Sequence, residues 1–244
     1  MNPSNREKEY SIAIINYEMA GTLEESLRSI LEQLDEQFEV LVVDDGSTDG
    51  SQTILDKLEE EYEIFRWVEG DNNNRGEARK QSVKEAEGQN IITSIDCDDS
   101  YEEESIKIFC NTYEKLNNSL EKDVFLFGKA IAIGPREKFL ENNYRNIHTR
   151  EDSDLERRMF TDEEIEFILP QHREIHAELG YKKESVKNIL KLRYEESKGH
   201  LRGGVSFLFH LDYQIRKIKD LTQQGWKDEV FKILTLPIAY IHAK

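Results

Sequence analysis

The sequence predicts an α/β protein with a mostly parallel sheet flanked by helices and a helical C-terminal part. Two observations predict this class. In the first half, short apolar runs alternate with segments whose apolar residues recur every three or four positions. This alternation is typical of parallel sheets, because parallel strands need long crossover connections that are usually helical. From about residue 151 onward, helical patterns dominate.

Length and composition set the scale of the fold. The chain has 244 residues, of which 37% are hydrophobic and 34% charged, and this balance fits a soluble globular protein. We expect a single domain over 1–244, with an α/β part at 8–133 and a more charged part at 134–244. No apolar run approaches the roughly 18 residues that span a bilayer. The polar start has no signal-peptide pattern, so we expect a cytoplasmic protein.

The charge balance limits the partners. Asp and Glu number 50 against 33 Lys and Arg, giving a net charge of −17. Because such a charge repels phosphate backbones, nucleic acid is not an expected partner. An anionic ligand would need a metal ion or particular arginines at its site. The two cysteines, Cys97 and Cys110, suggest neither a disulfide framework nor a zinc site.

Five strands are predicted in the first half. The first two, YSIAIIN and FEVLVV, are the nearly continuous apolar runs expected of strands buried on both faces. The other three are each followed by polar or turn-forming residues. The predicted strands cover 10–16, 38–43, 63–68, 90–95 and 123–133.

Four helices are predicted between these strands. In the first, Leu23 and Leu27 lie on one face, and Thr22 with Glu25 forms a capping-box pattern at the start. Gly88 is placed to end the third helix as its C′ residue. The predicted helices cover 22–34, 50–61, 77–87 and 102–116.

Polar clusters follow three of the predicted strands. They are Asn16-Tyr17, Asp44-Asp45-Gly46-Ser47 and Asp96-Cys97-Asp98-Asp99. Because parallel strands share the edge at which they end, we expect the three clusters to meet there. Open parallel sheets bind their ligands beyond this carboxyl edge.

Three segments resemble family 2 glycosyltransferases of the GT-A fold. They are VLVVDDGSTDGS at 40–51, NRGEARKQSVKEAEG at 74–88 and IITSIDCDDSY at 91–101. Their order and spacing match over about 10–133, and the short NRG-x-x-R segment resembles archaeal members. The resemblance implies that 8–133 bind a nucleotide-sugar and that 134–244 form the acceptor side and a helical end.

Asp96 and Asp98 are the candidate metal ligands. Alternate residues of an extended segment project to the same side, and two carboxylates there can hold Mn²⁺ or Mg²⁺ bridging a diphosphate. The alternative is a solvated acidic turn that caps a helix. The resemblance implies that Asp98 is the direct metal ligand and that Asp96 also contacts the sugar or ribose.

Other residues are candidates for binding the donor. The resemblance implies that Asp45 accepts a hydrogen bond from the base, although Asp45 also fits an ordinary β-turn. Arg75 and Arg79 could bind the diphosphate through their planar guanidinium groups, and Gly76 would let the backbone approach closely. For the two arginines, the alternative is salt bridging on the helix surface.

Two aromatic or polar residues after the first strand are also candidates. Asn16 and Tyr17 match the family's pair at this position, and Tyr17 could stack on the base or line the pocket. The alternative is an ordinary loop aromatic.

The segment REDSDL at 150–155 resembles the family's ED motif. The resemblance implies that Asp152 is the general base, with Glu151 beside it. A general base must reach the acceptor hydroxyl within hydrogen-bond distance. The alternative is that these acidic residues only favour the first turn of a helix.

The C-terminal part offers weaker signals. His172 and His176 are spaced to share a helix face, but we expect both to be partly exposed helix residues. The apolar stretches 201–213 and 230–241 could lie on a membrane surface and present a lipid-linked acceptor. The alternative, which we favour, is that they pack on the sheet or form a homodimer interface.

These expectations converge on an inverting, metal-dependent glycosyltransferase. It would move a sugar from a nucleotide-diphosphate donor to a glycan or lipid-linked acceptor hydroxyl, with Mn²⁺ or Mg²⁺. A nucleotidyltransferase is disfavoured, since 16–25 (NYEMAGTLEE) lack a glycine-rich basic loop. A non-catalytic nucleotide-sugar-binding or interaction protein on the same fold remains the alternative.

Overall fold

The computed structural model describes residues 8–72, 74–128, 130–168 and 177–179. The chain forms two compact units. The first comprises Met1–Arg145 and Leu155–Gly180, and the second comprises Asn146–Asp154 and Tyr181–Lys244. All the strands that the structure describes, and helices α1 to α5, belong to the first unit, and helix α6 begins in the second.

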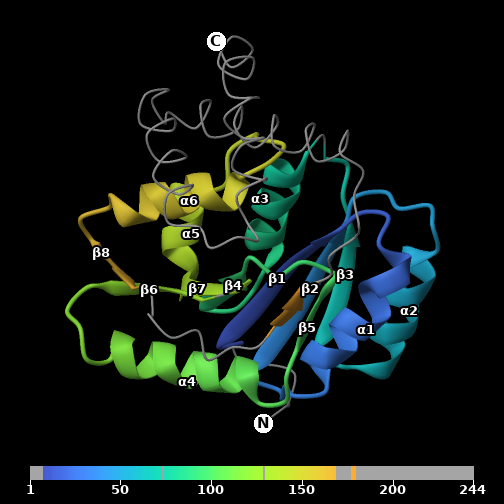
Figure 1. Ribbon diagram of the computed structural model, residues 1–244, viewed down its shortest axis with the longest axis horizontal. Coiled ribbons are helices and arrows are strands. Elements are labelled where there is room, and N and C mark those ends of the chain that lie inside the picture. Colours follow the sequence, from blue (N-terminus) through green and yellow to red (C-terminus); the bar gives the residue numbers. More distant parts are fainter. Residues whose placement is uncertain (1–7, 73, 129, 169–176, 180–244) are drawn as a thin grey trace, which may run out of the picture. The chain divides into compact units, whose positions relative to one another are not determined.

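Seven strands of the first unit form one sheet in the order β3-β2-β1-β4-β7-β6-β8 (Figure 1). The pairs β1–β2, β2–β3 and β1–β4 are parallel, as predicted. The strands are β1 Tyr10–Asn16, β2 Phe38–Asp44, β3 Phe65–Glu69, β4 Asn90–Thr93, β6 Asp123–Phe127, β7 Ala132–Pro135 and β8 Ile165–Ile168.

Helices cover both faces of this sheet, and the strand residues alternate between two apolar clusters. Ile12 and Val40 point into the cluster that α1, α2 and α4 complete, whereas Ala13 and Leu41 belong to the cluster of α3, α5 and α6. This alternation follows from the two-residue period of a strand. The helices are α1 Ala20–Leu31, α2 Ser51–Glu61, α3 Arg75–Glu85, α4 Ser105–Asn117, α5 Arg136–Asn142 and α6 Glu151–Phe160.

The single strand predicted at 123–133 is wrong, because the chain turns back within it. The backbone N–H of Gly128 donates to the carbonyl of Ile131 at 2.8 Å, and Ala130 has a positive φ of 54°. A Cβ on Gly128 would lie 2.8 Å from Ile131 Cγ2, so glycine suits this close turn. The result is a hairpin of β6 and β7, and β7 pairs antiparallel with β4 as well.

Two predicted helix-end signals are also wrong. α1 begins at Ala20 rather than Thr22, and no side chain of its own caps it. Instead, Oδ2 of Asp49 accepts from the backbone N–H of Ala20 at 2.8 Å. α3 ends at Glu85, before Gly88. A Cβ on Gly88 would lie 2.5 Å from the backbone nitrogen of Ser11, so this glycine permits a close approach to β1.

The second half is only partly helical among the described residues. α6 was predicted, but β8 follows it and pairs parallel with β6. A further strand, β9 (Ala177–Leu179), pairs antiparallel with β5 (Asp99–Tyr101) in a separate two-stranded sheet. The helices predicted beyond these strands lie outside the described residues, as do His172, His176 and the stretches 201–213 and 230–241.

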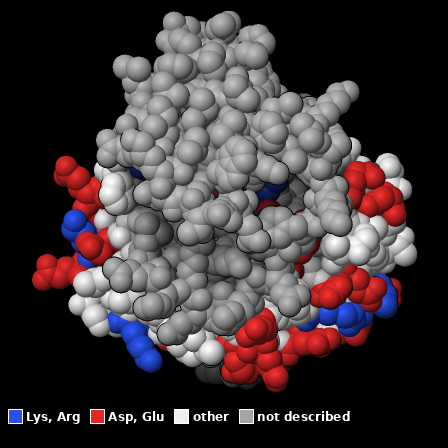
Figure 2. All heavy atoms as spheres, in the orientation of Figure 1, with Lys and Arg blue, Asp and Glu red and all other residues white. Residues whose placement is uncertain are grey.

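Among the residues that the structure describes, no helix is both long and apolar enough to cross a bilayer. Asp and Glu side chains are prominent on the described part of the face in Figure 2. An anionic ligand would therefore depend on cations placed locally at its site.

Candidate functional site

The register of the sheet brings the ends of three parallel strands level. Asn16 pairs with Asp44, and Asp44 pairs with Glu69. The last of the parallel neighbours, β4, ends at Thr93 and leads into the segment that carries Asp96. The three polar clusters thus follow strands that end at one edge, as the sequence predicted.

Asp44 builds the turn after β2 rather than facing a ligand. Its side chain is fully buried, and its two carboxylate oxygens accept from the side chain of Asn16 at 2.6 Å, from Gln52 at 3.0 Å and from the hydroxyl of Ser47 at 2.6 Å. The backbone N–H of Ser47 donates to it as well, at 3.0 Å. This network fixes the turn, and Asn16, the last residue of β1, takes part in it through its side chain.

The next residue, Asp45, lines an open pocket of about 510 Å³ at the ends of β2 and β3. Its Oδ1 accepts from the backbone N–H of Asn72 at 2.7 Å. A Cβ on Gly70 would lie 3.0 Å from that oxygen, so only glycine leaves the space open. The pocket is lined by Asp45, Gly46, Glu69, Gly70, Asp71 and Asn72. Because three of these are carboxylates, the pocket suits a ligand that donates hydrogen bonds.

The loop after β1 is joined to the loop after β2. Glu18 has a positive φ of 55°, and its Oε1 accepts from the backbone N–H of Thr48 at 2.7 Å. The backbone N–H of Glu18 in turn donates to Ser47 Oγ at 2.9 Å. Tyr17 lies between the buried Asn16 and the exposed Glu18, and it is itself 62% exposed. Tyr17 is therefore available to a ligand at this edge.

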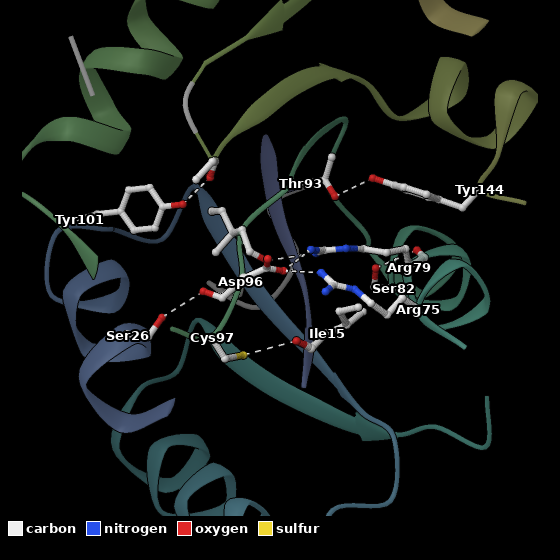
Figure 3. Close-up of polar contacts among 12 residues, drawn as sticks. Ile15, Ser26, Arg75, Arg79, Ser82, Thr93, Asp96, Cys97, Tyr101 and Tyr144 are labelled. Atoms are coloured by element: carbon white, nitrogen blue, oxygen red, sulfur yellow. Dashed lines mark hydrogen bonds and ion pairs between the residues drawn. The ribbon is translucent and has the colours of Figure 1, made fainter. Parts of the chain in front are cut away.

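Two arginines of α3 converge on Asp96 (Figure 3). Nη2 of Arg79 donates to Asp96 Oδ1 at 2.7 Å, and Nη2 of Arg75 donates to the same oxygen at 3.0 Å. The i, i+4 spacing of the arginines places both on one side of the helix. Arg79 is fully buried and also donates to the carbonyl of Ile95 at 3.0 Å.

These contacts set the charge state of the site. Burial of the Asp96 carboxyl group acts to raise its pKa, but the charges of Arg79 and Arg75 outweigh that effect, and the pKa lies below its ordinary value. Asp96 is therefore a carboxylate at neutral pH. Burial raises the pKa of the neighbouring Cys97 thiol, which donates to the carbonyl of Ile15 at 3.3 Å. Cys97 thus serves as a neutral packing residue between two carboxylates.

The donor set at Asp96 and Asp98 suits a divalent cation that takes further ligands from a substrate. Mg²⁺-like ions are commonly held by one or two carboxylates plus phosphate oxygens and water. In the described part of the chain, no cluster of three or more Asp, Glu, His or Cys could hold a metal alone. The segment begins at Ser94, which has a positive φ of 63°. Such strain is often found at functional sites.

Asp152 lies in the second unit, in the first turn of α6. Glu151, Asp152 and Asp154 are the acidic residues of that turn, and Glu151 and Asp154 are buried whereas Asp152 is partly exposed. Arg150, which precedes the helix, has a positive φ of 66°. The predicted role of Asp152 as general base stays a prediction.

Sequence reasoning missed several residues of this edge. Gln52 supports Asp44 from the first turn of α2, and Glu69, Asp71 and Asn72 line the pocket. The only signal for the last three was their position in the polar loop after the third predicted strand. Nothing in the sequence singled out Gln52, since its contact depends on how the helix packs.

Comparison with known proteins identifies the family. The model described as glycosyl transferase family 2 matches residues 11–190. Among curated proteins, the poly(ribitol-phosphate) beta-glucosyltransferase of Bacillus spizizenii is 33% identical over 141 residues, which are 54% of this chain and 21% of that protein. The cholesterol galactosyltransferase of Borreliella burgdorferi is 27% identical over 110 residues, 45% of this chain and 30% of that protein. The matched parts thus span about a third or less of these relatives.

Solved structures agree on the fold. A Pyrobaculum calidifontis mannosyltransferase in complex with GDP-Man and Mn²⁺ has a TM-score of 0.64 at 17% identity, covering 99% of this chain and 74% of that one. S. aureus TarS 1–349 in complex with UDP-GlcNAc has a TM-score of 0.61 at 16% identity, covering 96% and 79%. The predicted GT-A fold is confirmed. The resemblance to archaeal members stays a prediction, because a likeness at 17% identity shows the fold alone.

Proposed function

This chain belongs to glycosyl transferase family 2, and we propose that it transfers a sugar from a nucleotide-diphosphate donor to an acceptor hydroxyl, with inversion. The acceptor would be a glycan or a lipid-linked molecule. One observation carries the proposal. Asn72 is the last residue along the chain to line the pocket that accepts hydrogen bonds, and three residues later Arg75 donates to the carboxylate of Asp96. A nucleoside diphosphate complements both features, because the N–H groups of its base can donate in the pocket and its charged diphosphate can accept from an arginine.

Each part of the edge then has a task in donor binding. Asp45 accepts a hydrogen bond from a base N–H inside the pocket, and the exposed ring of Tyr17 stacks on the base. Asn16 acts indirectly, through the hydrogen bond that holds Asp44 and its turn. Gly76, at the start of α3, allows the backbone to approach the donor closely. The carboxylate of Asp96 contacts the ribose or the sugar.

The metal would be Mn²⁺ or Mg²⁺, held by Asp98 with Asp96. When bound, it would supply Lewis-acid stabilisation of the charge that develops on the leaving diphosphate. Two points support this assignment. Two carboxylates together with phosphate oxygens are a common ligand set for ions like Mg²⁺, and the Pyrobaculum neighbour was solved with both Mn²⁺ and a nucleotide-sugar.

The proposed chemical step needs one base. The carboxylate of Asp152 accepts the proton of the acceptor hydroxyl, whose oxygen attacks the anomeric carbon opposite the diphosphate. The bond from that carbon to the diphosphate oxygen breaks, and the nucleoside diphosphate leaves. A positioned general base typically contributes about 10²–10⁴-fold to the rate.

Release of nucleoside diphosphate tests this function. Wild type, Asp152→Asn and the control Glu163→Gln, an exposed carboxylate beyond α6, are incubated with UDP-, GDP- and dTDP-sugars, Mn²⁺ and a panel of alkyl glycoside acceptors. We expect release from one donor by wild type and the control. Asp152→Asn should bind that donor normally and release at least about 100-fold less. Donor binding without release by wild type would instead identify a non-catalytic binder.

A further inference from the structure

The two arginines of α3 donate to the same oxygen of Asp96 but differ in how far their side chains are exposed to solvent. The side chain of Arg79 is 0% exposed, whereas that of Arg75 is 48% exposed. The side chain of Asp96 between them is 43% exposed. Figure 3 shows both guanidinium groups directed at Asp96.

We propose that the two arginines have separate tasks: Arg79 is a positioning residue that holds Asp96 and does not contact the donor, whereas Arg75 leaves Asp96 when the donor binds and donates to its diphosphate. The division rests on the proposed function, because it requires a nucleoside diphosphate at this edge. It revises the expectation that both arginines bind the diphosphate.

Arg79 is fixed by its surroundings. It lies on the buried face of α3 with Ala78, Ser82 and Val83. Nη1 donates to the carbonyl of Ile95 and Nη2 to Asp96, so one guanidinium group ties the helix to two consecutive residues after β4. Removing a buried charge from its counterion is costly, because the remaining charge stays desolvated. Arg79 therefore keeps Asp96 in place in the presence or absence of a donor.

Arg75 can exchange partners at little cost. The two side chains of its pair with Asp96 are each only partly exposed, Arg75 at 48% and Asp96 at 43%, and ion pairs that water reaches contribute little free energy. Asp96 also retains Arg79 on the same oxygen after Arg75 leaves, so Asp96 keeps a counterion. The planar guanidinium group can then donate two parallel hydrogen bonds to phosphate oxygens. Its place three residues after the pocket residue Asn72 puts it where the diphosphate would follow the base.

Comparing the binding of each nucleoside diphosphate with that of its nucleoside distinguishes the two tasks. Binding of UDP, GDP and dTDP by wild type is compared with binding of uridine, guanosine and thymidine, all with Mn²⁺. The nucleosides lack the diphosphate but keep the base and ribose. For the nucleotide that binds, Arg75→Gln should weaken diphosphate binding by about tenfold or more and leave nucleoside binding unchanged. Arg79→Lys should weaken nucleoside binding as well, since Asp96, which this division of tasks assigns to the ribose, loses its position.

Lys80→Gln is the matched control, because it removes one positive charge from an exposed position of the same helix. We expect it to bind both ligands like wild type. Circular dichroism and a thermal melt establish that each variant is folded. If Arg79→Lys does not fold, Asp96→Asn replaces it, and the same loss of nucleoside binding is expected.

Two results would overturn the division of tasks while leaving the proposed function intact. One is an equal loss of nucleoside and diphosphate binding in Arg75→Gln. The other is unchanged nucleoside binding in Arg79→Lys or in Asp96→Asn. Failure of the proposed function is a different outcome, in which folded wild type binds none of the three diphosphates.

Discussion

Gly88 and Gly21 differ in the space that each leaves for an added Cβ. A Cβ on Gly88 would lie 2.5 Å from Ser11 N and 2.6 Å from the carbonyl carbon of Tyr10, whereas a Cβ on Gly21 would meet no atom within 4 Å. Gly88→Ala should therefore destabilise the protein by about 1–3 kcal/mol, as overpacking does. Gly21→Ala, in α1, should stabilise it by about 0.5–1 kcal/mol. Urea unfolding of both variants checks this, and equal midpoints would contradict it.

Neighbouring aspartates of the second motif should also differ. Asp44 is buried and accepts four hydrogen bonds, so Asp44→Ala should lower the free energy of unfolding by about 2–3 kcal/mol, because donors lose their partner. Asp45→Ala should leave stability nearly unchanged and weaken nucleoside binding instead. Urea unfolding and calorimetry with the nucleosides measure the two effects. The reverse pattern would remove Asp45 from the base site.

The sequence indicated which residues lie at this edge of the sheet, but it did not indicate how deeply each is buried or which side chains bond to one another. The sequence placed Arg79 in the third predicted helix and Arg75 in the loop before it, whereas the structure puts both in α3 and both reach one carboxylate. The sequence did not show that Arg79 would be buried, because burial depends on which face of α3 packs on the sheet. Likewise, the sequence predicted that the clusters containing Asn16 and Asp44 would meet, but not that these two side chains would bond, because their contact depends on the register of β1 and β2.

At the scale of the elements, a buried network at the amino ends of the strands should support the sheet without serving the site. Glu39 of β2 accepts from Arg66 Nε at 2.6 Å and from the backbone N–H of Glu87 at 2.9 Å, and the hydroxyl of Ser11 donates to it as well. Glu39→Ala leaves Arg66 without this counterion. We expect a loss on the order of 3 kcal/mol of unfolding free energy.

Donor affinity of Glu39→Ala should remain that of wild type, because the site lies at the other end of the strands. Glu60→Ala, on the exposed side of α2, is the control and should change neither quantity. A large loss of donor affinity in a folded Glu39→Ala protein would show that the two ends of the sheet are coupled.

An ion pair between α1 and α2 should make stability depend on pH. Arg28 donates to both carboxylate oxygens of Glu61, at 2.9 and 2.7 Å, and this hydrogen bonding holds the pKa of Glu61 below its ordinary value of 4.5. A depressed pKa stabilises the folded state above the unfolded-state value, and the contribution is lost as pH falls through the folded-state value. Arg28→Gln removes this contribution.

The difference in melting temperature between wild type and Arg28→Gln should therefore be constant from about pH 6 to 8 and should shrink toward about pH 3. A thermal melt at each pH measures it. A difference that grows in acid would contradict the role of this pair.

The helices and strands were predictable where strands and helices alternate regularly along the chain, and the prediction failed where the chain turns back. β1 to β4 and the helices between them were found from apolar periodicity. The β6–β7 hairpin was not, because the run DVFLFGKAIAI is apolar on both sides of Gly128 and no strong turn sequence interrupts it. β8 was missed because its pairing with β6 joins segments far apart in the chain.

At the scale of the whole molecule, the order of the parallel strands brings the residues of the proposed donor site together. β3, β2, β1 and β4 are neighbours, so loops that are distant in sequence meet at one edge. The sequence predicted this convergence from topology rules alone. It could not predict the pocket at Asp45, because the pocket depends on how the loop after β3 folds back on the turn after β2.

Calorimetric titration of the protein with UDP-, GDP- and dTDP-sugars, with and without Mn²⁺, tests whether this edge of the sheet binds a nucleotide-sugar. We expect that one donor binds, that Mn²⁺ strengthens its binding, and that Asp98→Ala removes the metal effect. Asp123→Ala, an exposed aspartate at the start of β6, should behave like wild type. If folded protein binds none of the donors under either condition, the edge is not a nucleotide-sugar site and the proposed function is wrong.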